Sequence, residues 1–371
     1  MTNILIVTNS LCFGGAESFS IQLYEKLKQS YNTHYLIFSD DMKILERFQN
    51  VRPQDIFSTN KGTRGFLSML SQTFKVYNYI KKNKIDVVYT SMPPSALVFW
   101  VIKLFYKKIK IIYITMHVYE NAGKNEITLW KTGLPNKSTD IFVGLSDYLS
   151  GQLINKNKVN KEKVVTNRLP VDTQKFSPNV KLKRSDVNLP EDKKILGICC
   201  RLHPQKRVHL FVETFRFLEN ENVLGVIYGE GEEHKKLVEL INKYNLNHKV
   251  LLRPFIDNIS EIIPLFDLYL QTVSGPNLGL VTLEAFSCGV PVIMLADNDE
   301  EIYMIEDTYC GQNVGRVSTT DPKIIADTVK ELLNDNLDEI KLNCRKLAVE
   351  QYSWEQFMKV NDKVLESFNL N

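Results

Sequence analysis

Apolar residues recur along this chain in short continuous runs rather than in alternation with polar residues. Ile4 to Val7, Tyr35 to Phe38 and Ile111 to Ile114 are such runs, and runs of this kind indicate strands buried on both faces of a parallel sheet. The segment from Phe19 to Leu27 lies between the first two runs and places its apolar residues at helical spacing. The pattern therefore predicts repeated strand–helix–strand units.

A polar interval divides this alternation into two halves. Residues 172–194 contain Pro178, Pro190, several charges and few apolar side chains, which is the composition of a linker. The alternation resumes at Ile195 and later includes a helix from Val281 to Ser287. We therefore expect an α/β protein with an N-terminal domain over 1–173, a C-terminal domain over 174–352 and a final helix over 353–371.

Composition and charge narrow the class of protein. Of the 371 residues, 44% are hydrophobic and 24% are charged, which excludes a disordered chain. The 46 Lys and Arg against 43 Asp and Glu give a net charge of only +3, too balanced to indicate binding to nucleic acid. The six cysteines show no C-x-x-C spacing, and the sequence has neither an apolar run long enough for a transmembrane helix nor a signal-peptide core. We expect free thiols in a cytoplasmic protein.

One segment, Ala96 to Lys108, has two interpretations. It is apolar on nearly every side, contains Trp100, and gathers Lys103, Lys107 and Lys108 toward its C-terminal end. In the first interpretation it is a well-packed crossover helix whose lysines favour the negative end of its dipole. In the second it is a helix that dips into an anionic membrane surface.

In the first half, candidate functional residues lie where predicted strands end. Gly14 and Gly15 lie between the first strand and the first helix, where backbone N–H groups can approach a phosphate. A tight turn favours glycine as well. His117 follows the strand that ends at Ile114, at the edge where ligands of open α/β sheets bind, although a lone histidine is more often structural.

In the second half, Arg201 and Lys206 follow the strand from Ile195 to Ile198. Two cations at the carboxyl end of a parallel strand can clamp a pyrophosphate that leaves with negative charge. They can also be solvated surface residues. Gly229 follows another strand, in a Gly-Glu-Gly sequence where the backbone either approaches a ligand or makes a plain turn.

The stretch from Gly275 to Ile293 carries more signals than any other. Gly279 lies at the start of a predicted helix, so the N–H groups of Leu280 and Val281 can face a diphosphate. Glu284 lies one turn further in, where a carboxylate can accept hydrogen bonds from ribose hydroxyls. An acid in this otherwise apolar helix needs a partner.

Taken together, these residues resemble the retaining glycosyltransferases of family 4, which have the GT-B fold of two Rossmann-like βαβ domains facing a central cleft. Gly14 to Glu17 is similar to the family's Gly-Gly loop, and Arg201 and Lys206 keep the spacing of its diphosphate clamp. The most specific match is Gly279 to Pro291. Two further segments match in order, 167–176 and 352–357.

The resemblance implies an enzyme that moves a sugar from a UDP- or GDP-linked donor to a glycan or lipid-linked glycan in cell-surface polysaccharide synthesis. The N-terminal domain would bind the acceptor and the C-terminal domain the donor. His117, Arg201 and Lys206 would be catalytic. The donor-binding residues would be Gly14, Gly15, Gly229, Gly279, Leu280, Val281 and Glu284. No metal or cofactor is expected, because Arg201, Lys206 and the helix-end N–H groups would stabilise the leaving group in place of a metal. A peripheral contact at the inner face of the plasma membrane is also expected.

One departure from the family pattern concerns the donor. The family has a glutamate eight positions before the residue that matches Glu284, and here that position is Pro276. Proline has no polar side-chain atom, so another carboxylate such as Asp257 or Glu230 would have to substitute. The departure keeps two alternatives open: a non-catalytic sugar-nucleotide-binding subunit, and a sugar-nucleotide epimerase of the same fold.

Overall fold

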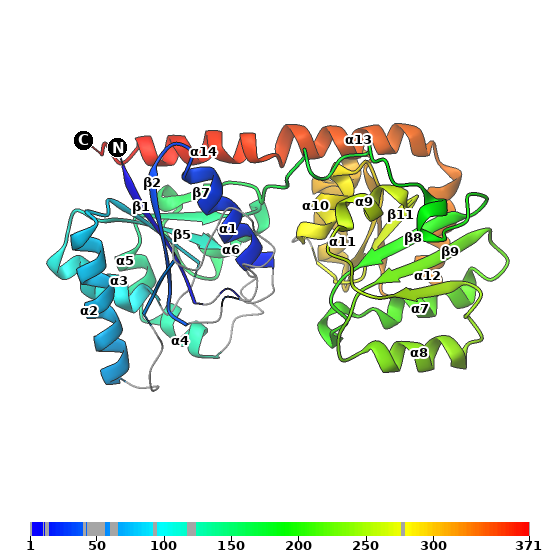
Figure 1. Cartoon of the computed structure of the whole chain (residues 1–371), viewed down its shortest axis with the longest axis horizontal. Coiled ribbons are helices and arrows are strands. Elements are labelled where there is room, and N and C mark those ends of the chain that lie inside the picture. The colour runs from blue at the N-terminus through cyan, green and yellow to red at the C-terminus, as the bar shows by residue number, and fades with distance from the viewer. Residues whose placement is uncertain are drawn as a thin grey trace. The chain divides into compact units, whose positions relative to one another are not determined.

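A computed structural model shows two α/β units, each built on a parallel sheet (Figure 1). Unit 1 comprises residues 1–168 and 359–371, and unit 2 comprises residues 169–358. The structure describes residues 2–9, 11, 15–39, 42, 56–59, 66–91, 95–116, 124–275 and 279–370. The predicted boundary at 173 lies a few residues after the division at 168, and the final helix belongs to both units.

Among the described residues, unit 1 has a seven-stranded sheet with the order β3-β2-β1-β4-β5-β6-β7. Its strands are β1 (Asn3–Thr8), β2 (Asn32–Ile37), β3 (Ile56–Ser58), β4 (Val87–Thr90), β5 (Lys110–Thr115), β6 (Ile141–Gly144) and β7 (Val164–Thr166). Its helices are α1 (Gly15–Leu27), α2 (Phe66–Lys82), α3 (Ser95–Phe105), α4 (Lys124–Lys131), α5 (Leu134–Ser138) and α6 (Asp147–Asn155). All the strand pairs are parallel, as the continuous apolar runs predict.

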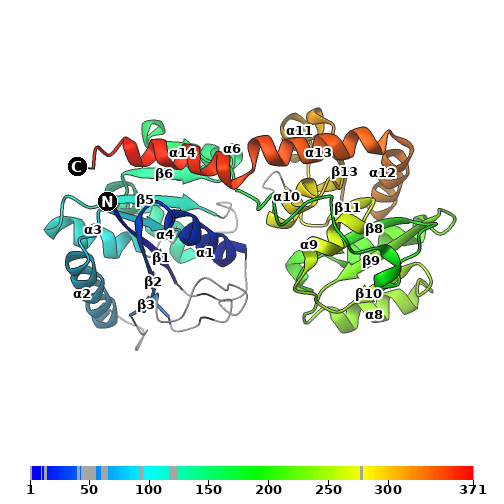
Figure 2. The same cartoon turned by 45° about the horizontal axis from the view of Figure 1, so that its top comes forward.

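Both faces of the unit 1 sheet are covered by helices (Figure 2). On one face, Val7 of β1 packs in a cluster with Val76 of α2 and Phe99 of α3. On the other face, the Tyr89 hydroxyl of β4 donates a 2.8 Å hydrogen bond to Oδ1 of Asn361, a buried residue of α14 (Trp354–Glu366). The chain's last helix therefore begins in unit 2 and completes the core of unit 1.

Unit 2 has a six-stranded parallel sheet with the order β10-β9-β8-β11-β12-β13. Its strands are β8 (Lys194–Cys199), β9 (Val223–Tyr228), β10 (Val250–Arg253), β11 (Leu268–Gln271), β12 (Val292–Ala296) and β13 (Gly315–Thr319). Its helices are α7 (His209–Thr214), α8 (His234–Lys243), α9 (Ile259–Ile262), α10 (Leu280–Ser287), α11 (Asp299–Thr308), α12 (Pro322–Asn334) and α13 (Leu337–Gln351).

A buried carboxylate ties the predicted linker to this sheet. Asp267, only 6% exposed, accepts hydrogen bonds from the Ile195 N–H (2.8 Å) and from Nη2 of Arg184 (2.7 Å). The Arg184 guanidinium also donates to the carbonyls of Leu265 (2.9 Å) and Lys193 (3.1 Å). The polar interval is therefore held against unit 2, because each of these buried polar groups has a partner.

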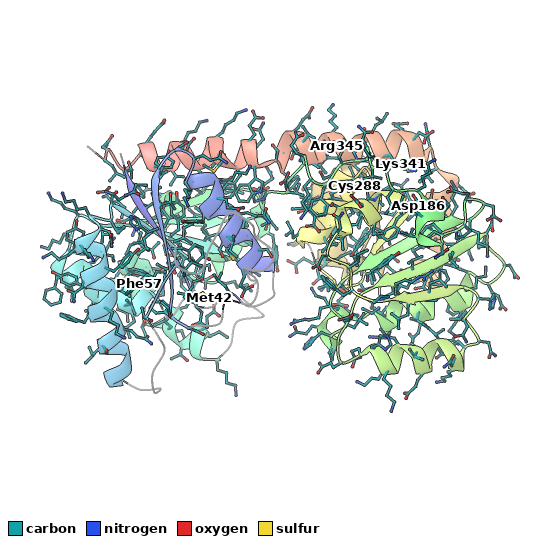
Figure 3. The ribbon with its side chains drawn as sticks, viewed as in Figure 1. Met42, Phe57, Asp186, Cys288, Lys341 and Arg345 are labelled. Atoms are coloured by element: carbon teal, nitrogen blue, oxygen red, sulfur yellow. The ribbon has the colours of Figure 1, made fainter. Side chains whose placement is uncertain are left out.

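A second arginine joins three separate segments of unit 2. Arg345 of α13 donates to the carbonyls of Thr173 (2.9 Å), Phe176 (2.9 Å) and Ser287 (2.7 Å). Ser287 is the last residue of α10, so the cation lies at the negative end of that helix dipole. Figure 3 shows Arg345 beside Cys288, the residue that follows α10. The guanidinium thus fixes the end of α10 relative to the start of the unit.

Several expectations about elements need correction. The apolar pattern from Val208 to Leu218 also predicts a helix, but α7 begins at His209 and ends at Thr214, and a 3₁₀ turn (Phe215–Phe217) follows. The short strands β3 and β7, and β13 at the edge of its sheet, were not predicted from the pattern of apolar residues. Lys103 does not extend into solvent with Lys107 and Lys108, because its ammonium lies 2.5 Å from Oδ2 of Asp140 and is largely covered.

We predict that Arg345→Met destabilises unit 2 by about 2–3 kcal/mol, because it leaves several partly buried carbonyl acceptors without their charged donor. Denaturant unfolding at constant pH measures this loss. Lys346→Met is the matched control, since Lys346 is exposed on the same helix and should change stability by no more than about 0.5 kcal/mol. Equal stability of the two variants would contradict the role given to Arg345.

Candidate functional site

The strand order of unit 2 reverses between β8 and β11. The chain passes from β8 to β9 and β10 on one side, and β11, β12 and β13 lie on the other side. In open α/β sheets the carboxyl ends of the strands at such a reversal border a crevice, because the loops that follow them diverge. Arg201, Lys206 and Gly279 all follow the carboxyl ends of these two strands.

The two predicted clamp cations have no carboxylate partner among the described residues. Arg201 is exposed two residues after β8, and Lys206 is half-buried at the end of a 3₁₀ turn (Pro204–Lys206). The neighbouring Arg207 differs, because Nη1 donates to Oδ1 of Asp297 (2.9 Å) and to Oγ of Ser274 (2.7 Å). Arg201 and Lys206 therefore keep their charge available to an anion, whereas Arg207 is used within the protein.

Helix α10 presents its positive end at the same edge. Its N-cap is Gly279, in extended conformation, and no side chain among the described residues caps the helix. Leu280 and Val281 form its first turn and are half-buried. Uncapped N–H groups at a helix N-terminus favour an anion. The geometry is thus compatible with the diphosphate contact predicted for these residues.

Glu284 is a buried carboxylate inside α10. It is 7% exposed, and its side chain forms no hydrogen bond or ion pair with any residue that the structure describes. Burial raises the pKa of Glu284 to about 8, an effect that the charge of nearby Lys175 partly offsets. Removing a carboxylate from water without a partner is unfavourable. The Glu284 carboxyl group thus keeps hydrogen-bonding capacity that no described residue fills.

The glycines at the predicted site fall into two classes. Among the described residues, a Cβ on Gly15 would meet no atom within 4 Å, and one on Gly279 would meet Nε2 of Gln271 alone, at 3.4 Å. A Cβ on Gly229 would lie 2.0 Å from the Cys200 carbonyl oxygen. Packing against Cys200 therefore requires a glycine at position 229. The described residues give no such packing reason for Gly15 or Gly279.

Some predicted residues lie outside the described part of the chain. These are His117, Gly14 and Pro276. No group of three potential metal-ligating side chains occurs among the residues that the structure describes. Of the predicted residues in unit 2, the structure brings Arg201, Lys206, Gly279, Leu280, Val281 and Glu284 to β8, β11 and α10.

Sequence reasoning missed the residues that support this edge. Asp297 follows β12 and holds Arg207, and Thr272 follows β11 and donates to the Lys206 carbonyl. The positions of these residues immediately after apolar strands were the available signal. Because their partners are distant in sequence, the pairing could not be inferred from spacing.

Two family descriptions match this chain and together cover most of it. Residues 179–366 match the family described as Glycosyl transferases group 1. Residues 13–175 match the family described as Glycosyltransferase Family 4. The first match spans unit 2 and α14, and the second lies within unit 1 except for its last few residues.

Comparisons with individual proteins agree with these family matches. The N-acetyl-alpha-D-glucosaminyl L-malate synthase of Bacillus anthracis is 23% identical over 81% of this chain and 77% of its own length. A UDP-Gal:alpha-D-GlcNAc-diphosphoundecaprenol alpha-1,3-galactosyltransferase of Escherichia coli is 23% identical over 64% of this chain and 66% of its own. The solved structure of Anabaena Alr3699/HepE in complex with UDP and glucose has a TM-score of 0.79 at 17% identity and covers 100% of both chains. This last likeness shows the fold.

We predict that the free energy of unfolding decreases as pH rises, because Glu284 is a buried acid with a raised pKa. Its folded pKa of about 8 lies above the unfolded value of about 4.3, so between these values the folded state binds more protons than the unfolded state. The free energy of unfolding must then decrease as pH rises. Between pH 6 and pH 8 the wild-type protein should lose about 2 kcal/mol relative to Glu284→Gln, which cannot titrate. Denaturant unfolding across this range measures the difference, and parallel curves for the two proteins would refute a buried acid.

Proposed function

The chain belongs to the glycosyl transferases of group 1 and is a glycosyltransferase, and from that premise we propose that it transfers a sugar from a UDP- or GDP-linked donor with retention at the anomeric carbon. The resemblance to GT-B enzymes of family 4 is confirmed for family and fold. The proposed acceptor is a glycan or lipid-linked glycan in cell-surface polysaccharide synthesis.

One observation carries the donor half of the proposal. Arg201 and Lys206 lie at the carboxyl end of β8 without carboxylate partners among the described residues, while the N-terminus of α10, uncapped by any described side chain, follows β11, the next strand in the sheet. Cations and helix N–H groups at one strand reversal suit a diphosphate, whose charge increases as the sugar leaves. Because these groups are fixed before the reaction, they stabilise the leaving group without a metal ion.

Glu284 is proposed to bind the ribose of the same donor. A carboxylate can accept hydrogen bonds from two neighbouring hydroxyls, which would satisfy the oxygens that the described residues leave unpaired. Gly229 also has a packing reason, because a Cβ there would meet the Cys200 carbonyl, and its donor contact stays a prediction. Gly15 keeps its proposed contact at the start of α1, since no packing among the described residues requires the glycine.

Relatives support the choice of donor and acceptor. The Anabaena structure contains UDP and glucose, and the Escherichia coli relative uses UDP-Gal and an acceptor linked to diphosphoundecaprenol. A lipid-linked acceptor would be met at the membrane surface, which gives unit 1 its proposed role. No helix in the described part of the chain is long and apolar enough to cross a membrane. Any membrane contact by these residues would therefore be peripheral.

The distribution of charge supports a peripheral contact through unit 1. Unit 1 carries 25 Lys and Arg against 14 Asp and Glu, whereas unit 2 carries 21 against 29. At the end of α3, Leu104 and Phe105 are 54% and 73% exposed, and Lys107 and Lys108 follow in solvent. Apolar side chains flanked by lysines suit an anionic lipid surface. This region replaces Trp100 and Lys103 in the predicted contact, because Trp100 is half-buried and Lys103 is paired with Asp140.

We predict that Arg201→Ala and Lys206→Ala each slow sugar transfer by about 30- to 1000-fold, equivalent to roughly 2–4 kcal/mol of barrier, with little change in unfolding free energy. Turnover is measured with a panel of UDP- and GDP-sugars in buffer containing EDTA, where the wild-type enzyme should keep its rate. Lys235→Ala is the matched control, since Lys235 is an exposed cation of the same unit.

Each contrary outcome of this assay has a distinct meaning. Near-normal rates in both variants would refute the clamp. Complete loss of wild-type activity in EDTA, restored by one divalent ion, would refute metal-independent transfer. Binding of sugar nucleotides without turnover of any would favour the non-catalytic subunit, and conversion of the donor sugar without an acceptor would favour the epimerase.

We predict that the wild-type protein floats with vesicles that contain phosphatidylglycerol and not with vesicles of phosphatidylcholine alone. The combination Phe105→Ser, Lys107→Glu and Lys108→Glu should reduce flotation at least tenfold, and added salt should weaken it as well. Lys243→Glu, an exposed change in unit 2, is the control. If the wild-type protein does not bind the anionic vesicles at low salt, the proposed membrane contact at this end of α3 is wrong.

A further inference from the structure

The clamp segment, defined here as residues 199–207, runs from the last residue of β8 through Arg201 and Lys206. Toward β9 its strand is held over its whole length, since β8 and β9 pair from Lys194↔Val223 to Cys199↔Tyr228. Toward β11 the ladder has only two pairs, Leu268↔Leu196 and Tyr269↔Gly197. The main chains of β8 and β11 therefore lose their direct pairing before the clamp segment begins.

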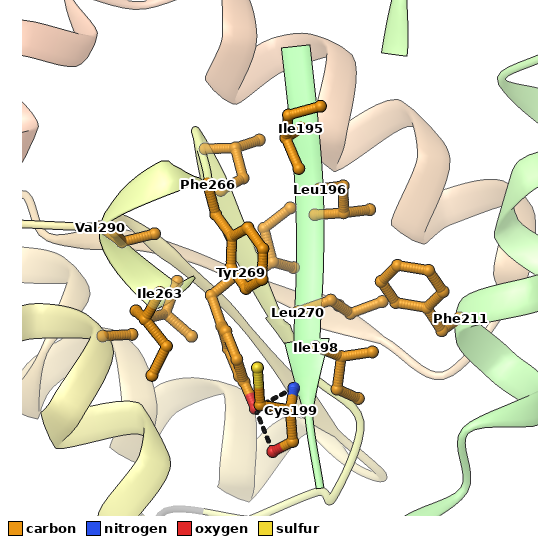
Figure 4. Close-up of a cluster of buried hydrophobic side chains, with 14 of the residues drawn as sticks. Ile195, Leu196, Ile198, Cys199, Phe211, Ile263, Phe266, Tyr269, Leu270 and Val290 are labelled. Atoms are coloured by element: carbon orange, nitrogen blue, oxygen red, sulfur yellow. Dashed lines mark hydrogen bonds between the residues drawn. The ribbon is translucent and has the colours of Figure 1, made fainter. Parts of the chain in front are cut away.

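Side-chain hydroxyls continue the connection where the ladder stops. The Tyr269 hydroxyl accepts a hydrogen bond from the Cys199 N–H (3.2 Å) and donates one to the Cys199 carbonyl (3.1 Å), as Figure 4 shows. Three residues later, Oγ1 of Thr272 donates to the Lys206 carbonyl at 2.5 Å. Both side chains are 1% exposed, so water does not compete for these bonds. Tyr269 of β11 and Thr272, which follows this strand, thus hold the backbone of the clamp segment at two places. One place is two residues before Arg201 and the other is at Lys206.

The last residue of β11 also lies next to the N-terminus of α10, the other part of the proposed diphosphate site. Gln271, the last residue of β11, places its Nε2 3.4 Å from the position of a Cβ on Gly279, the N-cap of α10. A shift of β11 relative to β8 would therefore move the helix N-terminus and the clamp cations apart. Errors of about 1 Å in such an arrangement are costly, because charge–dipole contacts with a diphosphate depend on simultaneous fit.

We infer that Tyr269 and Thr272 are positioning residues: their hydroxyls set the backbone positions from which Arg201 and Lys206 reach the donor diphosphate. The inference rests on the proposed function of the two cations and goes beyond it by naming the groups that place them. Neither hydroxyl touches the donor in this account. Tyr269 acts through Cys199 and Arg201, and Thr272 acts through Lys206.

The test is a set of double-mutant cycles on nucleotide binding. The single variants Tyr269→Phe and Thr272→Val delete one hydroxyl each and keep the shape of the side chain. Calorimetry measures affinity for UDP and GDP, and for UMP and GMP, which lack the second phosphate. Each variant should weaken binding of the better diphosphate about tenfold and should change binding of the matching monophosphate much less.

The cycles separate positioning from a general loss of stability. Tyr269→Phe should lose its effect on diphosphate affinity when Arg201 is already alanine, and Thr272→Val should lose its effect when Lys206 is alanine. The crossed pair, Tyr269→Phe with Lys206→Ala, should be close to additive, because each hydroxyl holds a different end of the segment. Tyr89→Phe in unit 1 also deletes a buried hydroxyl and should leave diphosphate affinity unchanged.

The outcomes distinguish this inference from the proposed function. If Arg201→Ala and Lys206→Ala leave diphosphate affinity intact, the clamp itself is wrong and the inference fails with it. If they weaken binding but the hydroxyl variants do not, or if every pair is additive, the clamp stands and the positioning role is refuted. If Tyr269→Phe fails to fold, as its unfolding transition would show, the cycle of Thr272→Val with Lys206→Ala decides.

Discussion

The edge of unit 2 that carries Arg201, Lys206 and Gly279 depends on a reversal of strand order within one parallel sheet. The chain follows β8 with α7, which packs with α8 and α12, and follows β11 with α10, which packs with α13. The chain thus continues from two adjacent strands to different helices, which is the arrangement that borders a crevice in open α/β sheets. Because a parallel sheet aligns all carboxyl ends, one reversal is sufficient to place cations and a helix N-terminus beside each other.

The polar groups in the interior of unit 2 differ in whether partners within the fold satisfy them. Asp267 and Arg345 have several charged or carbonyl partners each, so their burial is compensated and they join the linker, the sheet and α10. Glu284 lies in the same α10 and has no such partner among the described residues, and its raised pKa reflects that cost. Thr282 of the same helix also has a buried hydroxyl without a hydrogen-bond partner among the described residues, so two unpaired polar groups lie in α10 while Asp267 and Arg345 are satisfied.

Local signals in the sequence were sufficient for the architecture but not for the contacts. Continuous apolar runs predicted the central strands because burial on both faces leaves no polar positions, whereas β7 is half-exposed along its length and lacks that pattern. The Gly279–Glu284 stretch could be placed at a helix start from its own residues. The roles of Gly229, Lys103 and Tyr269 could not, because each is decided by Cys200, Asp140 or Cys199, and no spacing rule in the sequence connects these partners.

Unit 1 has a net positive charge and unit 2 a net negative charge. These charges are compatible with the proposed binding of an anionic membrane by unit 1 and an anionic donor by unit 2, because a small ligand and an extended surface respond to charges over different distances. A diphosphate is small, and at physiological ionic strength charges beyond about 8 Å are largely screened, so at the proposed site it would respond to Arg201, Lys206 and the α10 N-terminus rather than to the acidic excess of unit 2. A membrane is extended, so in the proposed contact several lysines of unit 1 would act on it at once and their separate contributions would add. The proposed donor site therefore requires a few cations at one sheet edge, whereas the proposed membrane contact depends on the summed charge of unit 1.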